Sequence, residues 1–417
     1  MRIPGLPRRR WPRVRWFRAV AALSAAMLLA GCAASANSTS SGSSTSKSPI
    51  VLAGLCAYTG STPSPESCQI SQAYFKYLNA HGGINGHPVE YTPLDDAGSS
   101  ATAQQDGARA VEQMNVDALV GDYSDYTCTV NAGLFAQYKV YDMSGPEADA
   151  NCWRSPYIFP INEGPWVEYA SDIYYLWSTH HDQVICLLDD PSFPGDVPDS
   201  ENTISIMEQI TGDHSMYLIP WTTGTPIAPV ASAVVARGCQ GFISAGLESD
   251  METLQRALYN LGATKNITML EGVLYASMAQ QEGAAGQGEL VASNDQPYWY
   301  DNTSELKLFH QLVNSIHEAP DSFSEEGFLS DLIFVAAVSK IGNGVYNRTT
   351  IGNALKNMKN ISGYGLQTPT TNWRDFNDST LVFEINNGTW TIPVSTWYYL
   401  KATPAQVEAI ATNTALK

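Results

Sequence analysis

Two successive series of short apolar runs, each alternating with stretches of helical periodicity, constrain the fold of this 417-residue chain more than any other feature. The first series starts with the run 50–55 and ends with a strand at 140–143. The second extends from a helix at 166–177 to a strand at 267–270. Apolar runs of strand length between helical stretches are typical of parallel sheets with helices on both faces. The sequence therefore predicts an α/β fold with two doubly wound parallel-sheet lobes.

The alternation breaks after Gly272, and we expect the rest of the chain to complete both lobes. This segment is too small to be a separate domain, so the chain must cross between the lobes more than once. Its hairpin is indicated by an Asn-Gly turn between two apolar runs. The expected elements are helices at 304–318, 328–341 and 351–358 and hairpin strands at 381–385 and 390–392.

The first residues predict an export signal rather than part of the fold. Seven arginines and no acidic residue accompany the apolar stretch 19–30, which is too short to span a bilayer. The run Leu29-Ala30-Gly31-Cys32 resembles a bacterial lipobox, in which the Cys carries the lipid and becomes the mature N-terminus. We expect a lipoprotein signal peptide at 1–31, lipidation at Cys32 and a flexible Ser/Thr-rich tether at 32–48. An uncleaved anchor helix is the alternative, and the export route, Sec or twin-arginine, stays open.

Cleavage before Cys32 changes the charge of the chain. The precursor has 23 Lys and Arg against 41 Asp and Glu, a net charge of −18. Seven arginines leave with residues 1–31, so 16 basic residues remain against 41 acidic ones and the net charge becomes −25. This balance argues against a nucleic-acid partner, because phosphate binding requires a Lys and Arg surface. The single apolar segment also excludes a polytopic membrane protein.

Six further cysteines follow Cys32. An even number of cysteines in an exported protein suggests disulfides, and six cysteines allow 15 pairings, among which sequence alone does not choose. A metal centre would require CxxC or clustered Cys and His ligands, which the sequence lacks, so we expect no metal and no cofactor. Adjacency along the chain favours Cys56–Cys68, Cys128–Cys152 and Cys186–Cys239.

Three segments of the first series carry motifs that occur together. The segment 77–86, after the first predicted helix, contains the pattern N-x-x-G-G-I-x-G, and the next strand ends in Leu94-Asp95-Asp96-Ala97. The segment 121–127 starts with Gly and contains Ser and Thr. These motifs resemble the N-x-x-GGI-x-G segment, the DDA and the Ser/Thr-rich ligand loop of type I periplasmic binding proteins, and most of all of the branched-chain amino-acid binding proteins of ABC transporters. The resemblance covers 49–294 and implies two lobes joined by three connections.

The resemblance also implies a function. In this family the ligand lies between the lobes, beyond the carboxyl ends of the strands, and a hinge motion closes the lobes around it for recognition by a membrane permease. We therefore expect an exported, lipid-anchored, monomeric solute-binding protein that delivers a small amino-acid-like ligand to an ABC permease. Lobe 1 is expected to comprise 49–163 with 294–372, and lobe 2 to comprise 164–293 with 373–417.

In lobe 1, the loop Ser124-Asp125-Tyr126-Thr127 directly precedes a predicted helix. The free N–H groups and the dipole of that helix favour a carboxylate or another anion, and the hydroxyl groups of Ser124 and Thr127 would add hydrogen bonds. Capping of the helix by Asp125 or Thr127 is the alternative interpretation. Tyr58, which follows the first strand, is expected close to the same cleft.

The resemblance implies further ligand contacts from both lobes. In the next loop of lobe 1, Ser144 and Gly145 match the family's pattern, while Glu147 stands near a position where the family often has Thr. In lobe 2, one ligand loop carries an aromatic residue in the family, and another often carries Tyr. The segment that contains Glu271 resembles the one whose Glu pairs with the ligand's amino group; a surface acid at a strand end is the alternative. The aromatic corresponds to Phe193, and Leu247 stands at the Tyr position.

Other functional classes are less well supported by the sequence. The chain lacks the GxSxG and HExxH motifs, and the SxxK match at Ser304–Lys307 lacks its KTG partner, so we do not expect an enzyme. A sensor that reports ligand to a membrane partner would have the same fold. A scaffold without a ligand is the remaining alternative.

Overall fold

The computed structural model describes residues 47–416 except 61–62, 192–195, 247, 274, 373–378 and 394–395. The predicted signal peptide, Cys32 and most of the tether lie outside the described residues, as do Phe193 and Leu247. Our expectations for these positions stay predictions. None of the helices in the described part of the chain is long and apolar enough to cross a membrane.

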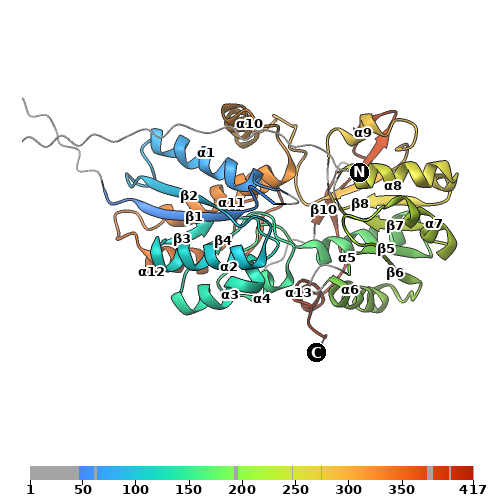
Figure 1. The fold of residues 1–417 in the computed structure, drawn as a ribbon, viewed down its shortest axis with the longest axis horizontal. Helices are drawn as coiled ribbons and strands as arrows, with labels where there is room; N and C mark the ends of the chain where they lie inside the picture. The colour runs from blue at the N-terminus through green and yellow to red at the C-terminus, as the bar shows by residue number, and fades with distance from the viewer. Residues whose placement is uncertain are drawn as a thin grey trace, which may run out of the picture. The chain divides into compact units, whose positions relative to one another are not determined.

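Lobe 1 is built on a four-stranded parallel sheet with the order β2-β1-β3-β4 (Figure 1). Its strands alternate their side chains between two apolar layers, so that Leu52 and Val120 face one layer and Leu55 and Leu119 face the other. Helices α1, α10, α11 and α12 contribute to the first layer, and α2 and α3 to the second. The strands are β1 (Ile50–Cys56), β2 (Val89–Asp95), β3 (Ala118–Val120) and β4 (Asp142–Met143). The helices are α1 (Glu66–Ala80), α2 (Ser100–Ala108), α3 (Thr127–Tyr138), α4 (Ala150–Arg154), α10 (Ser304–Ile316), α11 (Ser322–Ser339) and α12 (Arg348–Lys356).

Lobe 2 is built on a larger sheet with the order β11-β10-β9-β8-β7-β5-β6, with β12 paired to β10. Strands β5 to β9 are parallel, and β10 runs antiparallel to β9 and β11. Helices α5, α6 and α13 pack on one face and α7 and α8 on the other. The strands are β5 (Ile185–Asp189), β6 (Met216–Pro220), β7 (Gly241–Ser244), β8 (Thr268–Glu271), β9 (Leu290–Ser293), β10 (Ser379–Asn386), β11 (Thr389–Thr391) and β12 (Tyr398–Tyr399). The helices are α5 (Pro165–Tyr175), α6 (Asp196–Thr211), α7 (Ala228–Arg237), α8 (Glu248–Asn260), α9 (Met278–Gln281) and α13 (Pro404–Ala411). Short π-helical or 3-10 turns lie at Arg109–Gln113, Leu176–His180 and Ala263–Lys265.

The predicted fold class, an α/β fold with parallel sheets in two lobes, is confirmed. Strand β1 and helix α10 begin at the predicted residues, Ile50 and Ser304, and the hairpin of β10 and β11 turns at Asn387-Gly388, both with positive φ. Helix α11 begins six residues before the prediction, at Ser322, because Asp321 and Ser324 form a capping box there. Strand β9 was not predicted.

The three disulfides favoured by adjacency are all present in the structure. Cys56–Cys68 joins the end of β1 to the first turn of α1, and Cys128–Cys152 joins α3 to α4. The third, Cys186–Cys239, links β5 to the segment before β7. Each pair therefore fastens neighbouring elements within one lobe.

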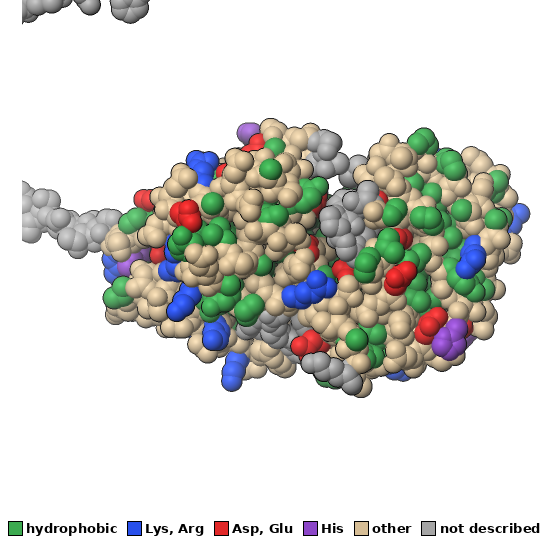
Figure 2. Space-filling model, turned by 60° about the horizontal axis from the view of Figure 1, so that its bottom comes forward, with side chains coloured by type: hydrophobic (Ala, Val, Ile, Leu, Met, Phe, Trp, Pro, Cys, Tyr) green, Lys and Arg blue, Asp and Glu red, His purple; other side chains and the backbone are tan. Residues whose placement is uncertain are grey.

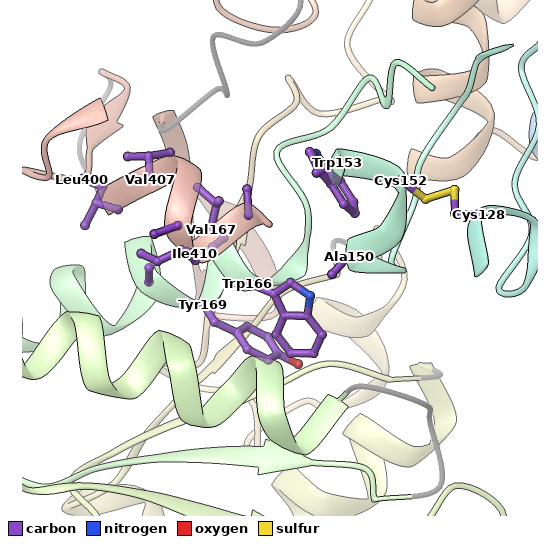
Figure 3. Packing of buried hydrophobic residues seen from close by; sticks show 14 of the residues in the cluster. Cys128, Ala150, Cys152, Trp153, Trp166, Val167, Tyr169, Leu400, Val407 and Ile410 are labelled. Atoms are coloured by element: carbon purple, nitrogen blue, oxygen red, sulfur yellow. A yellow bond between two sulfur atoms is a disulfide. The ribbon is translucent and has the colours of Figure 1, made fainter. Parts of the chain in front are cut away.

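The chain passes between the lobes three times, after α4, after β9 and after α12. At the first crossover an apolar cluster joins the lobes, in which Trp153 of α4 and Trp166 of α5 contribute to the same core as Val407 and Ile410 of α13 (Figure 3). On the surface beside it, Arg154 Nε donates a hydrogen bond to Thr412 O at 2.6 Å. Packing of α4 against the start of α5 and against α13 thus fixes the first crossover.

We predict that Gly164→Ala, within this crossover, destabilises the fold. Gly164 has φ of +88° and ψ of 153°, a region that is nearly restricted to glycine, and a Cβ there would lie 2.7 Å from the Trp153 indole. Strain alone costs about 1–3 kcal/mol. Urea unfolding measures the loss. Gly133→Ala is the control, because its Cβ would meet nothing within 4 Å inside α3 and should stabilise the helix; equal effects of the two substitutions would contradict the prediction.

Candidate functional site

The carboxyl ends of the parallel strands in each lobe lead into the loops that sequence analysis selected. In lobe 1 these loops follow β1, β2, β3 and β4, and in lobe 2 they follow β5, β7 and β8. Open α/β sheets bind ligands at this edge.

Asp95 at the end of β2 organises the loop that follows β1. Its carboxylate accepts hydrogen bonds from the Tyr58 and Thr59 backbone N–H groups, the Thr59 hydroxyl and the Ala97 N–H, at 2.8–3.1 Å. Although burial raises the pKa of Asp95, these hydrogen bonds lower it below its usual value. An ionised Asp95 therefore holds Tyr58 in place. The Tyr58 hydroxyl is buried without a hydrogen-bond partner, and burial, with Asp95 and Glu66, raises its pKa to about 12.

The loop after β3 is held by Asp96, which follows β2, and by Asn131 of α3. The Ser124 hydroxyl donates to the buried Asp96 carboxylate, and Ser124 O accepts from Thr127 N at 3.3 Å. Thr127 Oγ1 accepts from Asn131 at 3.0 Å. Because the Ser124 hydroxyl donates its proton to Asp96, its oxygen is left to a ligand only as a hydrogen-bond acceptor.

Helix α3 begins at Thr127 with Tyr126 as its N-cap residue and with no side-chain cap. The capping alternative for Asp125 or Thr127 is therefore not seen. The first-turn N–H groups of a helix have no intrahelical acceptor. In α3 the Thr127 N–H donates to Ser124 O, so the N–H groups that follow it in the first turn are the ones that could meet an anion. Asp125 stands beside them, and burial together with Asp96 raises its pKa to about 6.

The loop after β4 packs into the lobe. Gly145 N donates to Asp122 O at 2.8 Å, and a Cβ on Gly145 would lie 2.4 Å from the Ser67 hydroxyl of α1, so close packing requires glycine there. Ser144 is fully buried, and its hydroxyl has no partner. Glu147 is also buried, and burial raises its pKa well above its usual value.

Aromatic side chains that sequence reasoning missed line the same loops. Tyr123 stacks on Phe323 at the start of α11, with ring centroids 5.2 Å apart and planes at 15°. Tyr275, beyond β8 in lobe 2, is among the groups that raise the pKa of Tyr123, after burial, Asp125 and Glu147. The Tyr275 hydroxyl donates to Gly246 O at 3.0 Å. Tyr123 lies within the segment 121–127 that resembles the family's ligand loop, whereas no sequence motif indicated Phe323 or Tyr275 as site residues.

Glu271 ends β8 with no exposed surface. Burial raises its pKa well above the usual value, and its side chain lies within hydrogen-bond reach of Glu289, which in turn contacts Glu282. We call Glu271, Glu282 and Glu289 the lobe-2 acid cluster. The structure thus places Glu271 among other acids, and its contact with a ligand amino group stays a prediction.

Glu168 in the first turn of α5 is a second acid that the sequence did not single out. A Cβ on Gly272, directly after β8, would lie 3.5 Å from the Glu168 carboxyl carbon. Glu168 is partly exposed, whereas Glu271 is not. Glu168 is therefore the acid placed to meet solvent or ligand at the carboxyl end of β8.

One group of the described residues has the spacing of a metal site, namely Cys128, Glu147 and Cys152. Both cysteines are joined in a disulfide, so neither offers a thiolate. These three residues therefore do not favour a metal centre.

Two pairs of buried carboxyl groups are in contact, and each pair can form a hydrogen bond only if it holds a proton. As ionised carboxylates, the oxygens of Asp122 and Asp142 and those of Glu271 and Glu289 have no hydrogen-bond donor. The two members of each pair lie within hydrogen-bond reach, so a bond forms only when they share a proton. Burial raises the pKa of Asp122 to about 6 and, in the lobe-2 acid cluster, that of Glu282 to about 7.

These pKa values predict that the free energy of unfolding falls as the pH rises. The folded carboxyl groups keep protons that the unfolded chain releases above about pH 4. The stabilisation is complete below the unfolded pKa and is lost through about pH 6 to 7, where Asp122 and Glu282 ionise. Urea midpoints measured between about pH 4 and pH 8 should decrease.

Glu289→Gln provides the specific check, because the amide is neutral at every pH. We expect it to raise the unfolding free energy near pH 8 by about 1 kcal/mol and to flatten the pH dependence. Glu90→Gln, on the exposed face of β2, should do neither. A midpoint that increases with pH in the unsubstituted protein would overturn this account.

The sequence matches the family model described as periplasmic binding protein over residues 49–389. No curated protein is similar enough in sequence to be a relative. Solved structures show the same fold at low identity. A leucine binding protein of Thermotoga maritima has 15% identity and a TM-score of 0.68, covering 83% of this chain and 98% of its own. The branched-chain amino acid transporter substrate binding protein of Streptococcus pneumoniae, in complex with isoleucine, has 16% identity and a TM-score of 0.67. The match covers 84% of this chain and 99% of that protein.

A fatty acid ABC transporter substrate-binding protein of Thermomonospora curvata also has the fold, with 15% identity, a TM-score of 0.73, and coverage of 89% of this chain and 95% of its own. These likenesses agree with the two lobes, the parallel sheets and the three crossovers found above. The family model spans well over half of the chain. The chain belongs to the periplasmic binding protein family and has its type I fold.

Proposed function

We propose that this chain is an extracytoplasmic solute-binding lipoprotein that captures a small polar, amino-acid-like ligand between its lobes by hinge closure and delivers it to an ABC permease. The observation that carries the proposal is the family match over 49–389 on a fold whose ligand loops gather at the carboxyl ends of both sheets. The division into lobes at 49–163 with 294–372 and 164–293 with 373–417 belongs to the same proposal.

The chemistry of the site supports a ligand with a carboxylate. Uncapped N–H groups at the start of α3 suit an anion, and Thr127 and the unpartnered Ser144 hydroxyl lie in the adjoining loops. The solved relatives described above bind or are named for leucine, isoleucine and fatty acid, which all carry a carboxylate. In this proposal Tyr58, Ser124, Asp125, Tyr126, Thr127, Ser144, Gly145, Glu147, Phe193, Leu247 and Glu271 are the binding residues.

The remaining surfaces of the site suit the rest of such a ligand. The Tyr123 and Phe323 rings offer a rigid apolar face, which packs on a side chain at low entropic cost. Glu168, beside Gly272, adds a carboxyl group from lobe 2 that can accept a hydrogen bond from an amino group. Together these groups match the three parts of an amino acid.

Ligand capture is tested by mass spectrometry of small molecules that co-purify with the protein, followed by thermal shift with the molecule found. Thr127→Val should then weaken binding about tenfold, the effect of one lost hydrogen bond. Thr349→Val, on the exposed face of α12, should leave affinity unchanged. Unchanged affinity in Thr127→Val would remove the loop after β3 from the site, and absence of any ligand would favour a scaffold.

Lipid anchoring is tested separately on protein extracted from membranes. We expect intact-mass and peptide analysis to show a chain that begins at Cys32 and carries acyl groups. Cys32→Ser should shift the protein into the soluble fraction. An unmodified N-terminus upstream of Cys32 in the membrane form would contradict the proposal.

A further inference from the structure

Acidic side chains from both lobes and from the crossovers meet at one place, which we call the junction cluster: Glu163, Glu168, Asp172, Asp295 and Glu326. Glu163 lies in the first crossover and Asp295 in the second, directly after β9. Glu168 and Asp172 belong to α5 of lobe 2, and Glu326 to α11 of lobe 1. Gln367, in the third crossover, lies against Asp295.

The junction cluster is closed off from water except at Glu168. The exposed fractions of Glu163, Asp172, Asp295 and Glu326 are 1%, 0%, 1% and 8%. Burying a charged group without a partner costs several kcal/mol, and an acid avoids this cost if its pKa rises and it stays neutral. Ionisation of these acids is therefore linked to how tightly the junction of the two lobes is closed.

The charged groups that act on these acids in the described chain are themselves acids. Glu163 is affected by Glu168 and Asp295, Glu168 by Asp172 and Asp295, and Asp172 by Glu163. Glu326 is affected by Asp295, Glu163 and Glu168, and the neighbouring Glu325 by Asp295 and Asp321. The neutral partners are Asn294, beside Glu163, and Gln367. Figure 2 shows Lys and Arg side chains at the surface of one face of the molecule.

Asp295 and Glu326 show how the cluster holds together. Their side chains lie within hydrogen-bond reach, but neither can donate to the other when both are ionised, which leaves one Glu326 oxygen without a donor and Asp295 with only its contact to Gln367. One shared proton turns this repulsive contact into a hydrogen bond between the second crossover and α11. Burial raises the pKa of Asp295 to about 7, although Gln367 and Glu326 lower it in part.

We propose that the junction cluster is a proton-operated latch: protons shared between its buried carboxyl groups hold the two lobes together, and loss of these protons lets the lobes move apart. Each ionisation releases one proton to water and leaves a carboxylate that gains hydration only if the junction opens. The latch goes beyond the proposed function, because it acts on the empty protein. Its position beside Glu168 and Gly272 also connects it to the ligand edge of lobe 2.

The test measures the distance between the lobes by electron spin resonance. The full chain, with Cys32→Ser, receives spin labels at Lys76→Cys on α1 and Gln280→Cys on α9, two exposed positions in different lobes. The native cysteines of the described chain are all in disulfides and do not react. We expect one short distance near pH 4 and a second, different population that grows towards pH 8, without any ligand.

Two substitutions in the cluster should alter this response. Glu326→Gln keeps the size of the side chain and stays neutral, so the midpoint of the transition should rise by about one pH unit or more. Asp295→Asn combined with Glu326→Gln should remove most of the pH dependence. If the double variant fails to fold, Asp172→Asn alone should still shift the midpoint upward.

A matched control separates a latch from general acid stability. Glu289→Gln lies in the lobe-2 acid cluster, away from the crossovers, and should change the urea midpoint without changing the distance transition. A distance that is independent of pH, or a transition unaltered in both Glu326→Gln and the double variant, would overturn the latch. Restoration of the acid distance at pH 8 by calcium chloride, reversed by EDTA, would also overturn it and identify a cation site. Loss of ligand binding with an intact distance transition would count against the proposed function alone.

Discussion

The contact between Asp295 and Glu326 requires a shared proton, and it lies where the chain crosses between the two sheets. The junction of the lobes therefore depends on protonation. Segments that are far apart in the sequence, at 163, 295 and 367, meet there, and α5 and α11 add their own acids. On the other side of the first crossover, Trp153 packs against the glycine backbone of Gly164. The lobes are thus joined by an apolar contact that does not respond to pH and by a polar one that does.

Each lobe also contains a buried carboxyl pair that requires a shared proton. Asp122 with Asp142, and Glu271 with Glu289, are also carboxyl pairs that bond only through a shared proton. A folded protein is stable by only about 5–15 kcal/mol, so several such pairs acting together make pH a major variable for this fold. Most proteins lose stability in acid because their paired carboxylates must protonate. Here burial raises the pKa of the paired carboxyl groups in the folded protein, so the dependence has the opposite sign.

Much of the fold was predictable because its signals are local. Apolar runs mark β1, β5 and β7, the Asn387-Gly388 turn marks the hairpin, and neighbouring cysteines pair with each other. Strand β9 was missed because only four residues, Leu290–Ser293, follow a Gly-rich segment without a strand-length apolar run. It was also essential, since β10 pairs with it to bring the C-terminal hairpin into lobe 2.

The candidate site was predictable only in part, for the same reason. The loop 124–127 and Ser144 follow strands whose order fixes where they emerge. Glu168 and Phe323 lie at the starts of helices, and their positions depend on how α5 and α11 pack, which no local pattern reports. The burial of Glu271 likewise depends on the partners that β9 and α9 place around it. Tertiary packing decides these positions.

Protonation of Asp125 at the proposed ligand site and protonation of the latch both favour ligand binding. A carboxylate at the start of α3 would lie beside Asp125, whose pKa is raised to about 6 by burial and by Asp96. Below that pH Asp125 is neutral, so the repulsion between it and the ligand disappears and the free N–H groups of the helix dominate. The junction cluster is protonated over the same range and holds the lobes together. Because closed lobes bind the ligand more tightly than open ones, both titrations favour binding in acid. Protonation of Glu168, whose pKa burial also raises, acts against them by weakening its attraction for a ligand ammonium group. The pH dependence of affinity therefore measures the balance between lobe closure and the charge of this one acid.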